Sequence, residues 1–328
     1  MSDSASESLN VHSESEKNNE CSTNGSIKPQ IEQKGETVAK SGSEVPCSVV
    51  ENPTSVNGAA NSVPEVGSSE VEYIESDHLN DLEDVDLSLK TLLTGLDSKD
   101  WVLVCEALNK VRRLCIFHKD AMLDILDNVI SLVVKSLKNP RSAVCKTALM
   151  TCADIFKAYR DDLIDLLDPM LVQLLLKSSQ DKKFVCEAAE KALISMTTWI
   201  SPVSLLPKLQ PYLKNRNPRI RAKAAMCFSR SAPKLGVDGI KAYGIDKLIE
   251  IAISQLSGQL PESREAARTL LLELQTVYEK SHAPNADDVS DGPDTTSWED
   301  FCQSKLSPLN AQAVLRVTSI VREGVVGS

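Results

Sequence analysis

Basic side chains recur at one kind of place in this 328-residue chain, and their spacing points to a chemistry. They lie at or just before the expected start of a helix, in five segments roughly 40 residues apart: Lys99, Arg141, Lys182, Lys183, Arg219, Arg221 and Arg264. A cation opposes the helix macrodipole at an N-terminus, so such placements are unfavourable for the helix itself. Their recurrence along one edge of the protein therefore predicts a surface that binds an acidic partner.

Residue types that support catalysis or metal binding are not arranged for either. The chain has no P-loop, no GxGxxG after a strand pattern and no GxSxG elbow, and its four histidines are scattered. The nine cysteines form no CxxC pair, and Cys105, Cys145 and Cys186 share one repeat column, which favours small packing residues. We therefore expect a protein that is not an enzyme and that uses no cofactor or metal.

The basic residues belong to an internal repeat. The aligned segments are DWVLVCEAL from Asp100, NPRSAVCKTAL from Asn139, KKFVCEAAEKAL from Lys182, NPRIRAKAA from Asn217 and PESREAARTL from Pro261. Small residues return at fixed offsets with a period near 40, which is typical of two-helix repeats of the HEAT or armadillo kind. The sequence therefore predicts an all-α fold, an α-solenoid of five such repeats in which each repeat covers its neighbour.

Composition divides the chain into three expected parts. Residues 1–78 are predicted to be a disordered acidic tail, because the first 70 residues contain 15 serines and no Phe, Trp or Tyr. Residues 79–280 are predicted to form the five-repeat array, and 281–328 an acidic linker followed by a short sixth helical pair or a tail. Residues 99–280 carry 28 Lys and Arg against 20 Asp and Glu, so the array is basic although the chain is acidic. The chain shows no long apolar run, so we expect a soluble intracellular protein with no membrane partner.

The segments LKNPRSAVCKTAL, DKKFVCEAAEKAL and NRNPRIRAKAA resemble the intra-repeat turns of TOG domains, most of all those of the CLASP and crescerin families. The resemblance covers roughly residues 83–280. It implies binding to αβ-tubulin or microtubules, regulation of microtubule organisation or dynamics, and a place on the cytoplasmic microtubule cytoskeleton. By position, it implicates as tubulin-binding residues Trp101, Val144, Lys146, Lys183, Asn217, Arg219, Arg221 and Arg264. TOG domains have six HEAT repeats, and here the sixth is faint.

Two other functions fit parts of this pattern. A HEAT or armadillo adaptor would hold a different protein partner in its concave groove, but the Trp–Asn ladder of importin-like arrays is absent, since Trp101 is followed four residues later by Cys105. Nucleic-acid binding is allowed by the basic array and disfavoured by the lack of interleaved aromatics, so we expect no nucleic-acid partner. Trp101 itself shares a stripe with Val104 and Leu108, which leaves it either a core residue or an exposed anchor.

Overall fold

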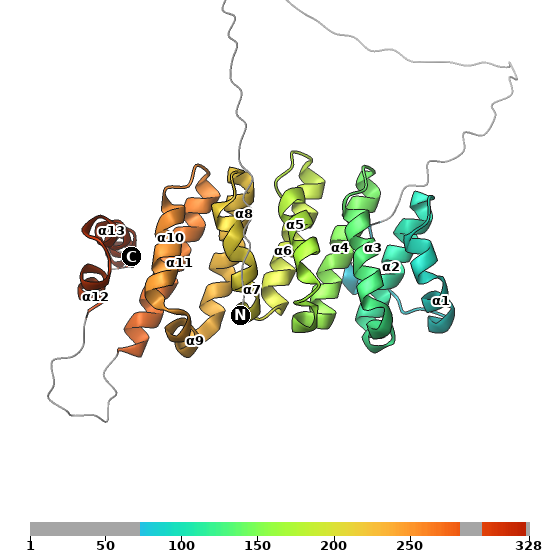
Figure 1. The fold of residues 1–328 in the computed structure, drawn as a ribbon, viewed down its shortest axis with the longest axis horizontal. Helices are drawn as coiled ribbons and strands as arrows, with labels where there is room; N and C mark the ends of the chain where they lie inside the picture. The colour runs from blue at the N-terminus through green and yellow to red at the C-terminus, as the bar shows by residue number, and fades with distance from the viewer. Residues whose placement is uncertain (1–72, 283–296, 326–328) are drawn as a thin grey trace, which may run out of the picture. The chain divides into compact units, whose positions relative to one another are not determined.

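The computed structural model describes residues 73–282 and 297–325, and these ranges contain helices and turns but no strand (Figure 1). Most of the predicted N-terminal tail, residues 1–72, lies outside the described residues. No helix in the described part is both long enough and apolar enough to cross a membrane.

Twelve of the described helices form six consecutive pairs, and the two members of each pair pack on each other. The pairs are α1 (Val85–Leu96) with α2 (Trp101–Phe117), α3 (Leu126–Leu137) with α4 (Ser142–Tyr159), α5 (Leu167–Lys177) with α6 (Lys183–Trp199), α7 (Pro202–Leu209) with α8 (Pro218–Ser231), α10 (Ile245–Leu256) with α11 (Pro261–Ser281), and α12 (Trp298–Lys305) with α13 (Pro308–Val325). The second helices α2, α4, α6, α8 and α11 contact one another in succession (Figure 1). The predicted all-α solenoid of two-helix repeats is confirmed.

Shorter elements lie before the first pair, between successive pairs and within the fourth pair. The 3₁₀ segments are η1 (Ser76–His78), η2 (Lys119–Ile125), η3 (Arg160–Leu163), η4 (Gln210–Lys214) and η5 (Ala232–Leu235). One further helix, α9 (Gly236–Tyr243), precedes the fifth pair and has no counterpart in the sequence prediction. Its two ends are Gly236 and Gly244, whose φ angles of 69° and 97° favour glycine over any residue with a Cβ.

An NPR motif lies at or just before the start of two of the second helices, α8 and α4. Asn217 accepts a hydrogen bond from the Arg219 amide at 3.0 Å, and Pro218 is the first residue of α8, as the NPR motif predicts. The same motif at Asn139 behaves differently, because its side chain accepts from the Arg141 amide at 2.9 Å and α4 begins only at Ser142. At Asn139 the motif therefore forms a turn ahead of the helix, and Arg141 is the residue that precedes α4.

Apolar stripes on the paired helices form one continuous core. On α2 the stripe consists of Val104, Leu108 and Val111, each no more than 5% exposed. Small residues occupy equivalent places on the later helices, such as Ala148 on α4 and Ala189 on α6, both fully buried. Small side chains let neighbouring second helices approach closely, which explains why they recur with the repeat period.

The last pair occupies the range in which the sequence suggested a short sixth pair. Ser297 and Asp300 form a reciprocal capping box at the start of α12. The Trp298 ring is 5% exposed and lies 5.5 Å, centroid to centroid, from the ring of Tyr278 on α11. Aromatic packing therefore joins this pair to the fifth one across the undescribed residues 283–296.

Residues 73–81 pack on the array ahead of α1, and we call them the N-terminal strap. Leu79 of the strap is 5% exposed, and the Ser76 hydroxyl donates to Asp154 of α4 at 2.7 Å. The predicted tail boundary at residue 78 is therefore wrong, because residues 73–78 already contact the folded array. Composition could not place this boundary, since the strap is as polar as the residues before it.

Candidate functional site: the edge of intra-repeat turns

The connections within the first five pairs lie at the N-terminal ends of the second helices. They are turn 1 (97–100), turn 2 (138–141), turn 3 (178–182), turn 4 (215–217) and turn 5 (257–260). We call these turns, together with the first helical turn that follows each of them, the turn edge. The second helices stack in succession, so the turn edge brings together residues that are about 40 positions apart in the sequence.

Three basic residues of the turn edge reach back to the preceding turn. The Arg141 guanidinium lies over the Trp101 ring, 5.2 Å from its centroid, and Lys182 Nζ donates to Ser142 Oγ at 3.2 Å. Arg219 donates to Asp181 Oδ1 at 2.6 Å and to the Ser179 carbonyl at 3.2 Å. The hydrogen bond and the charge of Asp181 raise the pKa of the Arg219 guanidinium. Turns 1 to 4 thus form a connected series.

Arg221 and Arg264 make hydrogen bonds within their own turns, which the sequence did not predict. Arg221 Nη1 donates to the carbonyls of Asn215 and Arg216 at 2.7 and 3.1 Å, and Arg264 Nη1 donates to those of Gly258 and Gln259 at the same two distances. Each arginine therefore folds back over its own turn. Carbonyls that follow a helix end have no partner within the helix, and a guanidinium supplies the missing donors.

Two other predicted site residues do not present a free side chain. Val144 is fully buried in the core, so it cannot contact a partner, and its assignment as a binding residue is corrected. Its column is the buried stripe of the second helices, and in α4 that stripe begins at Val144. Lys146, two residues further on, holds its Nζ 3.7 Å from the centroid of the Tyr73 ring of the strap.

The remaining predicted residues lie on the surface of the turn edge. Lys183 has an 88% exposed side chain and a long ion pair with Glu187 at 3.8 Å. Asn217 is exposed, although its side-chain oxygen already caps α8. Trp101 is half-buried, packing against the core on one side and lying under Arg141 on the other. Trp101, Lys183, Asn217 and Arg219 are thus the predicted residues that the turns bring to one surface.

The turn edge also exposes residues that the sequence reasoning missed. Leu103 on α2 is 47% exposed and Phe184 on α6 is 43% exposed. Each directly precedes a buried valine of the core stripe, so an apolar residue one position before that stripe was the available signal. Lys138 and Arg216 are exposed on turns 2 and 4, and neither forms an ion pair within the described residues.

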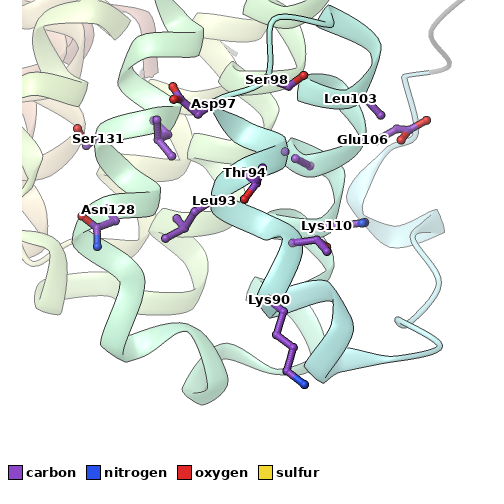
Figure 2. Close-up of a pocket in the computed structure, with 14 residues that line it drawn as sticks. Lys90, Leu93, Thr94, Asp97, Ser98, Leu103, Glu106, Lys110, Asn128 and Ser131 are labelled. Carbon is purple, nitrogen blue, oxygen red and sulfur yellow. The ribbon is translucent and has the colours of Figure 1, made fainter.

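Two hollows accompany the turn edge. One lies beside turn 1 between α1, α2 and α3, and Figure 2 shows Asp97, Ser98 and Leu103 on its wall with the hydroxyl and amide groups of Ser131 and Asn128. The other, of about 420 Å³, is lined by turn 3, the start of α8 and turn 5, which places Arg219 near Leu260 and Glu262. Turn 5 therefore continues the surface of turns 3 and 4.

Among the described residues, possible metal ligands are dispersed and most of the thiols are buried. Within them, no group of three or more His, Cys, Asp or Glu side chains is placed to hold a metal ion. Burial raises the pKa of the Cys227 thiol to about 12, and it also raises the pKa of Cys105 and Cys145. Such thiols are poor nucleophiles because the thiolate is the reactive form.

The fold is a helical-repeat array whose turn edge runs along its first five pairs. The chain is 30% identical to mouse "TOG array regulator of axonemal microtubules protein 1" over 138 residues, which are 42% of this chain and 8% of that protein. It is 27% identical to the human protein of that name over 175 residues, 53% and 10% of the two chains. The chain thus spans about a tenth of the length of these curated relatives. No family model matches the chain.

Solved structures share the fold at low sequence identity. A chain from a study of microtubule plus-end tracking by XMAP215, CLIP-170 and EB1 aligns with a TM-score of 0.51 and 17% identity, covering 74% of this chain and 94% of that one. The MAST/Orbit N-terminal domain aligns with a TM-score of 0.50 and 12% identity, covering 70% and 96%. The predicted resemblance to TOG domains is confirmed, since the sequence relatives carry that name and the solved chains have the same fold.

Proposed function

We propose that this chain binds αβ-tubulin or microtubules through its turn edge and thereby regulates microtubule organisation or dynamics in the cytoplasm. The array of residues 79–280 is the binding domain in this proposal, which involves no catalysis and no cofactor. The observation that carries it is the connected series of turns, which exposes cations and apolar side chains side by side. Lys138, Lys183 and Arg216 supply the cations, and Leu103 and Phe184 the apolar surface.

The chemistry of the turn edge supports a protein partner over a nucleic acid. Exposed lysines and arginines beside isolated apolar side chains suit an acidic protein surface, where charge sets orientation and buried apolar contacts set affinity. A single-stranded nucleic acid would need aromatic rings on which bases stack, and Trp101 is already covered by Arg141 on one side. Tubulin is named because the relatives of this chain are named for axonemal microtubules.

We assign the predicted residues to two roles in this proposal. Trp101, Lys183, Asn217 and Arg219 contact the partner directly, because the turns present them at the surface. Arg221 and Arg264 hold turns 4 and 5 in shape, and they contact the partner only with the parts of their guanidinium groups that their own turns leave free. Val144 is left out, and Lys146 contributes only when Tyr73 moves away from it.

The test is cosedimentation of the full-length chain with microtubules after reversal of three free cations. Lys138→Glu, Lys183→Glu and Arg216→Glu together remove three exposed positive charges and leave every connection between turns in place. A matched control carries Lys90→Glu, Lys241→Glu and Lys247→Glu, which change the net charge equally at exposed positions outside the turns. We expect the first variant to bind at least about tenfold more weakly than the control, because like charges then face each other.

Salt dependence and a nucleic-acid assay complete the test. Binding by the wild type should weaken steeply between low and physiological salt, as screening of exposed charges requires. Equal cosedimentation of the two triple variants, with both showing the wild-type helical spectrum, would exclude the turn edge as the binding surface. A gel shift of RNA or DNA that is lost in the first variant and kept in the control would replace tubulin with a nucleic acid.

A further inference from the structure

The N-terminal strap crosses the second helices of the first three pairs. Its contacts begin at Lys146 on α4, continue to Lys191 on α6, and end at His118 after α2. The strap is extended apart from the short η1 segment, so it presents its backbone as well as its side chains to these helices. It therefore sits on the array in the manner of a bound peptide.

A buried ion pair lies beneath the middle of the strap. Arg112 is 1% exposed and Asp154 is 5% exposed, and Arg112 Nε donates to Asp154 Oδ2 at 2.7 Å. A buried pair of this kind is stabilising only when its other polar atoms are also satisfied. Within the array itself, the guanidinium finds one more acceptor, the side-chain oxygen of Asn109 at 3.2 Å.

The strap supplies the groups that complete this pair. Arg112 Nη1 donates to the Ile74 carbonyl at 2.8 Å and Nη2 donates to Ser76 Oγ at 3.1 Å. The Ser76 hydroxyl in turn donates to Asp154 Oδ1 at 2.7 Å. The pair thus recognises a backbone carbonyl and, two residues later, a hydroxyl, which are groups that any extended peptide with a correctly placed serine can offer.

Further contacts hold the strap on either side of the Arg112–Asp154 pair. The Glu75 carboxylate lies 3.4 Å from Lys191 Nζ, and Lys146 Nζ lies over the Tyr73 ring. Leu79 is only 5% exposed. The strap is acidic and the side chains beneath it are mostly basic, so the two surfaces are complementary. The Glu75–Lys191 pair is well exposed, at 64% and 72%, and exposed pairs contribute little. The strap is therefore held mainly by Leu79 and the Arg112–Asp154 pair.

From this arrangement we infer that the second-helix face of pairs one to three is a peptide-binding surface, next to the turn edge, whose occupant in this chain is its own strap. The Arg112–Asp154 pair is the centre of the site. A competing partner must present the same order of groups, which in the strap is aromatic, aliphatic, Glu and Ser, with Leu three residues after the Ser. The strap then acts as an intramolecular ligand that excludes other acidic peptides.

The experiment uses the full-length chain and a fluorescent synthetic peptide of residues 73–82, YIESDHLNDL. Leu79→Asp in the protein should release the strap, because a carboxylate is strongly disfavoured in the buried position of Leu79. We expect the peptide to bind the Leu79→Asp protein at least about tenfold more tightly than the wild type, whose surface is occupied. Adding Arg112→Gln to Leu79→Asp should abolish this gain.

Exchanging the charges of Lys191 in the protein and Glu75 in the peptide distinguishes lost binding from misfolding. Loss of the exposed Glu75–Lys191 pair alone would have little effect, but Lys191→Glu places two like charges opposite each other. At low salt it should therefore weaken binding of the peptide to the Leu79→Asp protein, and a peptide with Glu75→Lys should restore it. This pattern cannot arise from loss of folding. The inference fails if the peptide binds wild type and Leu79→Asp equally, or if Lys191→Glu leaves both peptides unaffected. No tubulin enters the assay, so the result is independent of the function proposed for the turn edge.

Discussion

Arg219 on the first turn of α8 holds Asp181 of turn 3 at 2.6 Å, so a residue first noticed as an unfavourable cation at a helix start is also a connector between repeats. The carboxylate offsets the repulsion between the guanidinium and the positive end of the helix. Both side chains stay more than half exposed, which leaves them accessible to a partner as well as to each other. Arg219 thus connects two repeats and also contributes an exposed positive charge to the turn edge.

Arg219→Glu should lower the stability of the protein slightly. Helix-dipole reasoning alone predicts a slight gain, because an anion suits a helix N-terminus. The structure predicts the opposite, because the new carboxylate faces Asp181. Urea denaturation of Arg219→Glu, Asp181→Lys and the double variant should show partial recovery in the double variant. Arg268→Glu is the control, since Arg268 pairs with Glu265 within one helix, and no recovery should follow when Asp181→Lys is added to it.

Arg221→Ala should destabilise the array by about 1 kcal/mol, because two carbonyls of turn 4 lose a charged donor. Arg264→Ala should behave alike at turn 5, and the two losses should add because the turns share no hydrogen bond. Arg216→Ala is the control, since its side chain is exposed and forms no ion pair within the described residues. Equal midpoints in chemical denaturation for Arg221→Ala and Arg216→Ala would contradict this structural role.

Trp101→Ala should reduce both stability and microtubule binding. The ring is half-buried, so the loss of stability should fall below the ~3–5 kcal/mol typical of a fully buried aromatic residue. The loss of binding should reach at least ~1–2 kcal/mol if the ring is an anchor. Arg141→Ala separates these effects, since it uncovers the ring and removes a cation–π contact of about 0.5–1 kcal/mol. A Trp101→Ala protein that melts lower and cosediments normally would show that Trp101 is a packing residue.

Deletion of residues 1–72 should leave the melting temperature unchanged, whereas deletion of residues 1–82 should lower it by on the order of 5 °C. The second deletion removes Leu79 and the two strap groups that complete the Arg112–Asp154 pair. Differential scanning calorimetry of both truncations provides the comparison. Identical melting of the two truncations would show that the strap adds nothing to stability.

The contact between Asp81 and His118 should make part of the strap's stability depend on pH. Desolvation raises the pKa of Asp81, but hydrogen bonds from the Leu82 amide and from His118, with the charge of His118, outweigh it and lower the pKa. A carboxyl whose pKa is lowered on folding stabilises the fold above its unfolded pKa, about 3.9, and loses that effect as the pH falls through the lower value. Wild type should therefore melt above Asp81→Asn at pH 6, and the difference should vanish in acid. Asp77→Asn, which removes an exposed strap carboxylate without a described partner, should show no such convergence.

The repeat pattern was sufficient to predict the helix pairs, because small buried residues such as Ala189 and Ala225 must recur wherever second helices pack closely. It was insufficient for the site, because hydrophobic periodicity locates a stripe and not the point at which the stripe meets solvent. Val144 was therefore assigned to the surface although it is in the core. Arg221 and Arg264 were read as outward charges, because a bond to a backbone carbonyl leaves no mark in the sequence.

Neither the strap nor α9 was predicted from the sequence, for a related reason. Each is short, and a segment of eight or nine residues has too few positions to show a period. The strap depends on two buried charges that lie 42 residues apart in the chain, and only the packing of α2 on α4 brings them together. Such a pair cannot be recognised from one sequence, where Arg112 and Asp154 look like any other surface charges.

The contact between α6 and α8 is much less extensive than the contact between α4 and α6 on one side of it or between α8 and α11 on the other. In a stacked array, cooperativity passes only through neighbouring interfaces, so the weakest interface divides the molecule into blocks that unfold separately. The first block comprises the three pairs fastened together by the strap, and the second begins at Pro202. When force is applied to its two ends, the array should therefore unfold in two steps. The ion pair between Arg219 and Asp181 would be among the last contacts between the two blocks to break.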